Sequence, residues 1–143
     1  MRYNEVNDKL EFGEGEFRMG FWIYMLFMDL LLPFIMIGFG RYCMKKTPNE
    51  INTVFGYRTP MSTKNKDTWE FAHKYFGKIW YISGLITLPT SIILMFFVIG
   101  KGTELVGTAG AIIMGVQLVP MLGSIFPTEI ALRKNFDKNG ERK

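Results

Sequence analysis

Three long apolar stretches, separated by polar segments, dominate the pattern along the chain. They cover roughly residues 20–40, 79–100 and 105–132, and the charged residues gather between and after them. A helix needs about 20 mostly apolar residues to cross a hydrocarbon core of about 30 Å, and each stretch has that length. The rest of the sequence is too short and too polar to cover three such helices in a soluble domain. The pattern therefore predicts an all-α integral membrane protein with three transmembrane helices.

The polar segments set the expected boundaries of a single membrane domain that covers residues 1–143. Its expected parts are a flexible or surface-lying leader (1–18), a first span (about 19–41), a structured loop (42–66), a helix that continues into the second span (about 67–100), a third span (about 104–132) and a tail (133–143). The first apolar stretch does not have the pattern of a cleavable signal peptide, because its leader is acidic and no small-residue cleavage site follows before Arg41.

Lysine and arginine are distributed unevenly over the segments between the spans. Of the 17 Lys and Arg residues, four lie in the leader and the turn between spans two and three, and thirteen lie in the loop and the tail. The positive-inside rule predicts that the loop and the C-terminus are cytoplasmic and the N-terminus is outside, in a bacterial cytoplasmic membrane. The formal net charge of +4 then indicates attraction to the lipid bilayer and not direct binding of nucleic acid.

Three polar side chains are expected within or at the edge of the spans, namely Asp29, Gln117 and Glu129. A charged group at mid-bilayer costs about 3 kcal/mol or more when it faces lipid, so Asp29 should face another helix or a polar cavity, or be protonated. Two interpretations stay open: a carboxyl that fixes helix packing, and a contact for a proton, an ion or a ligand. Gln117 should hydrogen-bond across helices, and Glu129 lies at the interface.

Small residues recur at four-residue spacing in the third span, at Gly107, Ala111 and Gly115. Small residues at this period allow two helices to approach closely. We therefore expect this face to pack on the first or second span, or on a second copy of the chain in a homo-oligomer.

The loop between the first two spans contains a turn-forming segment. Pro60 restricts the residue before it to extended geometry, and Gly56 permits a positive φ, so the segment predicts a shaped loop. Asn65 is the expected N-cap of the helix that follows, with acidic residues in its first turn. One face of this helix collects residues spaced four apart, namely Trp69, His73 and Gly77.

The chemistry of most enzyme classes is missing from the sequence. His73 and Cys43 are the single histidine and cysteine and lie far apart, which argues against a zinc or Cys/His catalytic site. Asp29 and Glu129 are expected at different depths, which argues against a carboxylate pair for acid–base catalysis. No phosphate-binding glycine loop or nucleophile elbow occurs. We expect no enzyme activity, no metal and no cofactor.

The loop and the start of the second long helix resemble the signature of the SdpI family of bacterial membrane proteins. In that signature, a Gly-(Ile/Tyr)-Arg-Thr-Pro turn precedes a Trp, a His and a Gly that leads into a membrane helix. The motif and candidate binding residues in this stretch are Gly56, Tyr57, Arg58, Thr59, Pro60, Ser62, Asn65, Trp69, His73 and Gly77. The chain resembles a short form of the family that has only the C-terminal-type module. The resemblance implies immunity to a membrane-active, bacteriocin-like killing peptide, and signalling that holds a transcriptional repressor at the membrane.

Three functional hypotheses follow from these features. In the first, an immunity or envelope-stress protein contacts a toxic peptide through Asp29 and the small-residue face of the third span. In the second, a membrane scaffold docks a soluble transcriptional regulator on an exposed surface of Arg58, Trp69 and His73. The third hypothesis, transport of a small solute, rests on Asp29 and Gln117 and would require an oligomer.

The loop motif also has a purely structural interpretation. Arg58 would then form a salt bridge with Glu70 or Glu129, with Tyr57 and Trp69 packed over it, and would hold the ends of the helices together.

Overall fold

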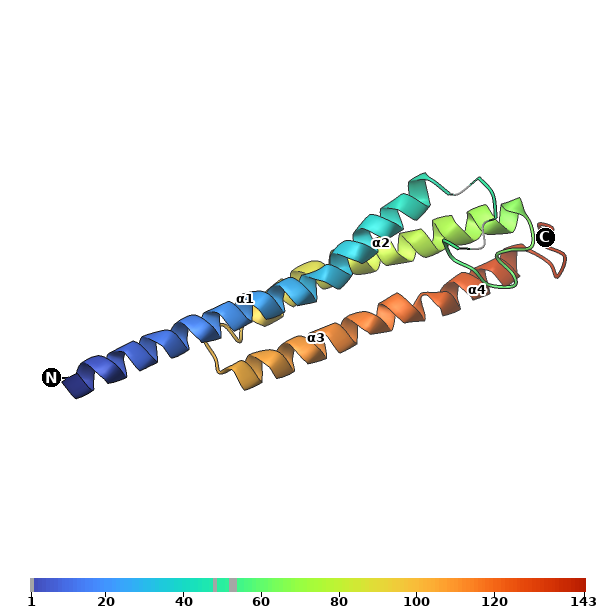
Figure 1. Ribbon diagram of the computed structural model, residues 1–143. Helices are drawn as coiled ribbons and strands as arrows, with labels where there is room; N and C mark the ends of the chain where they lie inside the picture. Colours follow the sequence, from blue (N-terminus) through green and yellow to red (C-terminus); the bar gives the residue numbers. More distant parts are fainter. Residues whose placement is uncertain (1, 48, 52–53) are drawn as a thin grey trace.

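The computed structural model describes residues 2–47, 49–51 and 54–143. Its helices are α1 (Arg2–Lys45), α2 (Lys66–Phe96), α3 (Thr103–Gly123) and α4 (Ile125–Asn135). In Figure 1, α1, α2 and α3 run side by side, and α4 continues the line of α3. Three helical stretches, Tyr3–Lys45, Lys66–Phe96 and Thr103–Asn135, are long and apolar enough to cross a membrane. The predicted all-helical architecture with three such helices is confirmed for the described residues.

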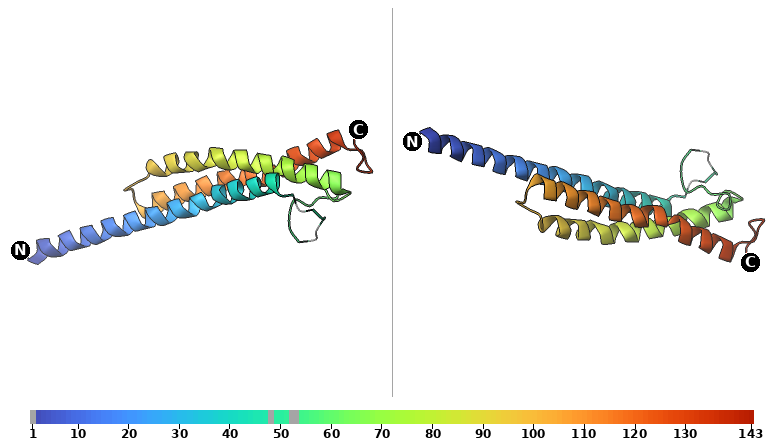
Figure 2. Two further views of the ribbon diagram at one scale, coloured as in Figure 1. Left: turned by 90° about the horizontal axis from the view of Figure 1, so that it is seen from above. Right: turned by 90° about the horizontal axis from the view of Figure 1, so that it is seen from below.

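The N-terminal leader differs from the sequence prediction. Residues 2–18 form the first part of α1 instead of a flexible or surface-lying segment. Both views of Figure 2 show this end of α1 extending beyond the other helices. Its Glu, Lys, Leu and Arg residues have high helix propensity, which outweighs the cost of about 1 kcal/mol for each of Gly13 and Gly15. A salt bridge of 3.5 Å between Glu14 and Arg18, four residues apart, adds to the helix.

The closest helix contact is the crossing of α1 and α2, and it is built on glycine. A Cβ added at Gly77 would lie 2.7 Å from the carbonyl oxygen of Gly40 and 2.8 Å from the Cβ of Cys43. A Cβ added at Gly84 would lie 3.0 Å from the carbonyl oxygen of Pro33. No side chain fits in these places, so the two backbones touch along this line. Dispersion between closely packed backbones stabilises helix pairs in lipid, where the hydrophobic effect does not.

The face that α3 turns toward the other helices includes only Gly107 of the three predicted small residues, and a Cβ added there would lie 3.6 Å from the Phe21 ring of α1. The buried residues of α3 are Val106, Gly110, Ile113 and Gln117. Ala111 and Gly115 are exposed, and a Cβ at Gly115 would meet no atom within 4 Å, so these two residues do not pack on α1 or α2. The reason is Gln117, whose amide must find partners inside the bundle and therefore sets the rotation of α3.

Candidate functional site

The predicted N-cap of α2, Asn65, is confirmed, and with Thr68 it forms a capping box. The Asn65 side chain accepts a hydrogen bond of 2.9 Å from the backbone N–H of Thr68, and the N–H of Asn65 donates to the Thr68 hydroxyl at 3.1 Å. The Asn65 amide also donates to the carbonyl of Gly140 in the tail, at 2.7 Å. The cap therefore joins the helix, the loop before it and the C-terminal tail.

His73 lies at the centre of the loop motif, with both ring nitrogens in use. Nδ1 is 2.8 Å from the carbonyl oxygen of Trp69, and Nε2 is 3.0 Å from the backbone nitrogen of Tyr57. A carbonyl only accepts and an N–H only donates, so Nδ1 carries the proton and Nε2 accepts. Trp69 and His73 are both 0% exposed. His73 is therefore an internal connection between α2 and the loop.

Gly56 is required by its contact with this histidine. Its φ is +117°, a conformation that L side chains rarely adopt, and an added Cβ would lie 2.2 Å from Nε2 of His73. The loop backbone can approach the ring only because this residue has no side chain. The glycine of the motif is thus explained by both its backbone angle and its surroundings.

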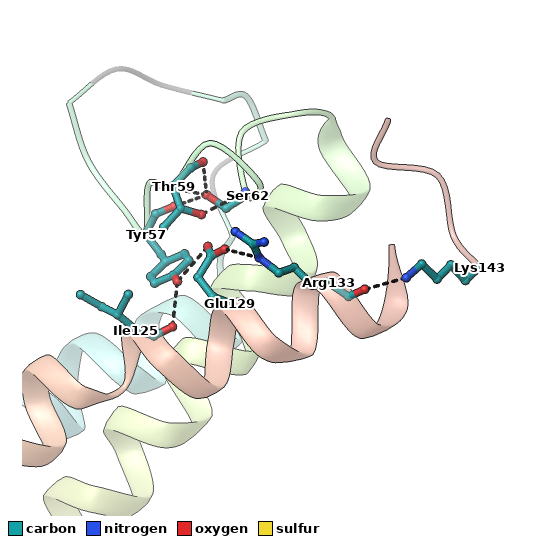
Figure 3. Close-up of polar contacts among 7 residues, drawn as sticks. All are labelled: Tyr57, Thr59, Ser62, Ile125, Glu129, Arg133 and Lys143. Carbon is teal, nitrogen blue, oxygen red and sulfur yellow. Dashed lines mark hydrogen bonds and ion pairs between the residues drawn. The ribbon is translucent and has the colours of Figure 1, made fainter. Parts of the chain in front are cut away.

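The Thr59-Pro60 step continues into a turn that is held by hydroxyl groups. Figure 3 shows the Thr59 and Ser62 side chains facing one another across this turn. The N–H of Thr59 donates to the Ser62 hydroxyl at 2.8 Å, and the N–H of Ser62 donates to the Thr59 hydroxyl at 3.2 Å. The Ser62 hydroxyl is also within 3.2 Å of the carbonyl oxygen of Tyr57. These bonds satisfy the buried polar groups of a segment without regular secondary structure.

Tyr57 connects the loop to α4. Its hydroxyl lies 3.3 Å from Oε1 of Glu129 and 3.3 Å from the carbonyl oxygen of Ile125 (Figure 3). Burial raises the pKa of this hydroxyl well above its ordinary value, and the charge of the Glu129 carboxylate and its hydrogen bond raise it further. Glu129 also faces Arg133 at 3.7 Å. Glu129, which the sequence analysis placed at the interface and considered as a partner of Arg58, is thus in contact with the motif through Tyr57.

Arg58 and Pro60 are the exposed members of the motif. The two carboxylates proposed as partners of Arg58 form salt bridges elsewhere, Glu70 with Lys74 and Glu129 with Arg133. The docking hypothesis predicted that Arg58, Trp69 and His73 form one exposed surface. That prediction is wrong, because the side chains of Trp69 and His73 are buried. The physical reason is that a tryptophan and a hydrogen-bonded histidine on one helix face bury well against a loop that can lie over them.

A second group of polar side chains lies inside the helix bundle. The Gln117 amide donates to the Asp29 carbonyl at 2.9 Å and to the Ser91 hydroxyl at 2.6 Å, so the predicted cross-helix role of Gln117 is confirmed. Ser91 was not singled out from the sequence, because a serine in a span gives no signal of its own. The side chain of Asp29 is 0% exposed and faces α3, where a Cβ at Gly110 would lie 3.2 Å from Oδ2.

The oxygen atoms of this interior group are incompletely paired. Both carboxyl oxygens of Asp29 and Oε1 of Gln117 are buried without a hydrogen-bond partner among the described residues. Asp29 and Glu129 lie in different parts of the molecule, the first against α3 and the second beside Tyr57. In the described part of the chain, no three His, Cys, Asp or Glu side chains come together as they would around a metal ion.

The loop motif and the helices that follow it also identify the family. A family model described as the SdpI/YfhL protein family matches residues 49–128, more than half of the chain. The match covers the motif loop, α2, α3 and the start of α4. A search of the curated proteins found no match, and neither did a search of the solved structures. The resemblance in the loop is therefore confirmed, and the chain belongs to the SdpI/YfhL protein family.

Proposed function

We propose that this SdpI-like membrane protein protects its cell against a membrane-active toxic peptide of the bacteriocin kind. The observation that carries the proposal is the family match across residues 49–128, which includes the whole motif from Gly56 to Gly77. The motif itself serves the fold, because its buried residues hold the loop, α2 and α4 together. The contact with a peptide is therefore better sought on the membrane-facing surface of the bundle.

The outer face of α3 is the surface best suited to such a contact. Ala111 and Gly115 are exposed there, beside Ile112 and Val116, which are 61% and 62% exposed. A peptide helix in the bilayer can approach closely over small residues and pack against the apolar side chains next to them. Asp29, by contrast, is enclosed between α1 and α3 and would meet a peptide only if the bundle opened.

Survival of a sensitive bacterial strain that expresses the protein tests this proposal. The strain is challenged with a panel of membrane-active killing peptides, and all variants are compared at equal abundance in the membrane. Gly115→Leu should abolish protection and leave folding intact, because Gly115 is exposed and a Cβ added there would meet no atom within 4 Å. Gly38→Leu, at an equally open position on α1, is the matched control and should protect like the wild type. Failure of the wild type to protect against any peptide would refute the proposal.

The same face of α3 would also suit a second copy of the chain. Disulfide crosslinking of a Gly115→Cys variant in membranes tests this homo-oligomer. Crosslinked dimers of this variant that form with the toxic peptide absent would assign the face to self-association, provided that the wild-type chain protects in the survival assay.

Docking of a soluble transcriptional regulator is a second candidate function. It is favoured by the exposure of Arg58 and of Val54, which is 90% exposed, on the loop. An arginine beside an apolar side chain is a common contact in protein interfaces. Copurification of a regulator with the wild type, and its loss with Arg58→Ala at equal abundance, would support this function. Full protection by Arg58→Ala would separate it from the immunity function.

A further inference from the structure

A basic groove lies between the end of α1 and the start of α2, and it shares only Trp69 with the residues of the loop motif. Its volume is about 640 Å³, and it is lined by Tyr42, Lys45, Lys46, Thr47, Asn49, Lys66, Trp69, Glu70 and Lys74. Glu70 is the one carboxylate in this lining, and it forms a salt bridge with Lys74. Among the described residues, Lys45, Lys46 and Lys66 have no salt-bridge partner. The groove therefore has an excess of positive charge, with a hydroxyl and an amide beside it.

The position of the groove along the helices matches the depth of lipid headgroups. The apolar part of α1 ends at Arg41, and that of α2 begins after Lys78. Lys45 and Lys74 each lie four residues beyond these limits, which is about 6 Å at 1.5 Å per residue. The headgroup layer on each side of the hydrocarbon core is about 5–8 Å thick. Lys45, Lys46 and Lys74 are thus at the depth of the phosphates of the surrounding lipids, and Lys66, at the first turn of α2, lies farther from the hydrocarbon core.

One face of α1 continues from the groove toward the bilayer centre. Leu31, Ile35, Gly38, Tyr42 and Lys45 follow one another at helical spacing, and all five are exposed. A Cβ at Gly38 would meet no atom within 4 Å, so the face is open at this point. An acyl chain can lie along Leu31 and Ile35 while its headgroup enters the groove, and the Tyr42 ring stands between the two at the interface.

We propose that this groove binds the headgroup of one anionic phospholipid, with its phosphate among Lys45, Lys46 and Lys74 and one acyl chain along the exposed face of α1. The groove recognises the net negative charge of a lipid whose phosphodiester is not neutralised, whereas a zwitterionic lipid cancels this charge with the cation of its own headgroup. The apolar face then distinguishes a lipid from a free phosphate ion, since only the lipid buries hydrocarbon against it. The proposal does not depend on the protective function.

Native mass spectrometry of the purified full chain in detergent tests this site, with dioleoyl phosphatidylglycerol as the probe. We expect one lipid to bind at least ten times more tightly than dioleoyl phosphatidylcholine. The Lys45→Gln/Lys46→Gln variant should bind the anionic lipid about ten times more weakly. The control Lys134→Gln/Lys138→Gln removes the same charge from exposed positions in α4 and the tail, and should bind like the wild type.

Three results would overturn the proposal. Equal loss of binding in both double variants would mean that net charge alone attracts lipid. Displacement of the lipid by millimolar inorganic phosphate would mean that the groove takes a free anion. Equal binding of the two lipids by the wild type would mean that the groove does not select charge. Thermal unfolding of each variant checks that it is folded, and if the double variant is not, Lys46→Gln alone must still weaken binding.

Discussion

Replacement of Gly56 by alanine should destabilise the protein through two separable effects. The first is the backbone, because φ at this residue is +117° and an L side chain there costs about 1–3 kcal/mol. The second is the contact with His73, since the new Cβ would lie 2.2 Å from Nε2 and must displace the ring. A displaced ring leaves the buried N–H of Tyr57 without its acceptor, at a cost of about 1–3 kcal/mol. Together they predict a loss of about 2–6 kcal/mol.

A double-mutant cycle with His73→Ala separates the two effects. In the His73→Ala background there is no ring to displace, so Gly56→Ala should cost only the backbone strain of about 1–3 kcal/mol. The free energy of unfolding can be measured by titration with sodium dodecyl sulfate in mixed micelles, with the fluorescence of the three tryptophans as the signal, one of which, Trp69, lies beside His73. Gly20→Ala is the control, because its Cβ would meet nothing and alanine favours a helix. Equal costs of Gly56→Ala in both backgrounds would refute the proposed contact.

Three further outcomes are expected. The pKa of Tyr57 is raised first by burial and then by Glu129, so the contribution of Tyr57 to stability is fully present below its ordinary pKa of 10.0 and is lost as the pH rises above that value. The free energy of unfolding should fall by up to about 1.4 kcal/mol per pH unit. Tyr57→Phe should lack this decline, and parallel curves of stability against pH for the two proteins would contradict the prediction. Asp29→Asn should keep the free energy of unfolding within about 1 kcal/mol of the wild type, because no charged group of the described residues pairs with the carboxyl, and a loss above about 3 kcal/mol would indicate a buried ion pair instead. Gly77→Leu should prevent accumulation of folded protein in the membrane, because the α1–α2 crossing has no room, and normal abundance would show that the crossing is looser than described.

The parts of the fold that could be predicted from the sequence depend on neighbouring residues. Three apolar stretches of sufficient length predict three membrane helices. The N-cap of α2 is also local, because Asn65 bonds to Thr68 within one turn. The leader was assigned wrongly because Gly13 and Gly15 were given more weight than the strong helix formers around them. The predicted start of the first helix was therefore too late because of a small difference in helix propensity between the two glycines and their neighbours.

The remaining features depend on contacts between residues far apart in the chain. Tyr57 and Glu129 are separated by 72 positions, and Asp29 and Gln117 by 88, so no local pattern joins them. The family resemblance correctly selected Gly56, Trp69 and His73 as a group, but it could not say that two of them are enclosed. The expected packing of Ala111 and Gly115 on the first or second span was wrong, because spacing alone cannot show which side of a membrane helix meets its neighbours, whereas Gln117 decides this by its hydrogen bonds. Packing of this face on a second copy of the chain stays a prediction.

The contacts of the loop form at different times during synthesis of the chain. Tyr57 and His73 are 16 positions apart and can meet as soon as the start of α2 has left the ribosome. The cluster that Tyr57 and Phe76 share with Leu132 and Phe136 can close only after the last membrane helix is made. A chain that stops before α4 would thus leave apolar side chains open to water, where membrane proteases and chaperones can bind them. Completion of the third span is in this way coupled to escape from quality control.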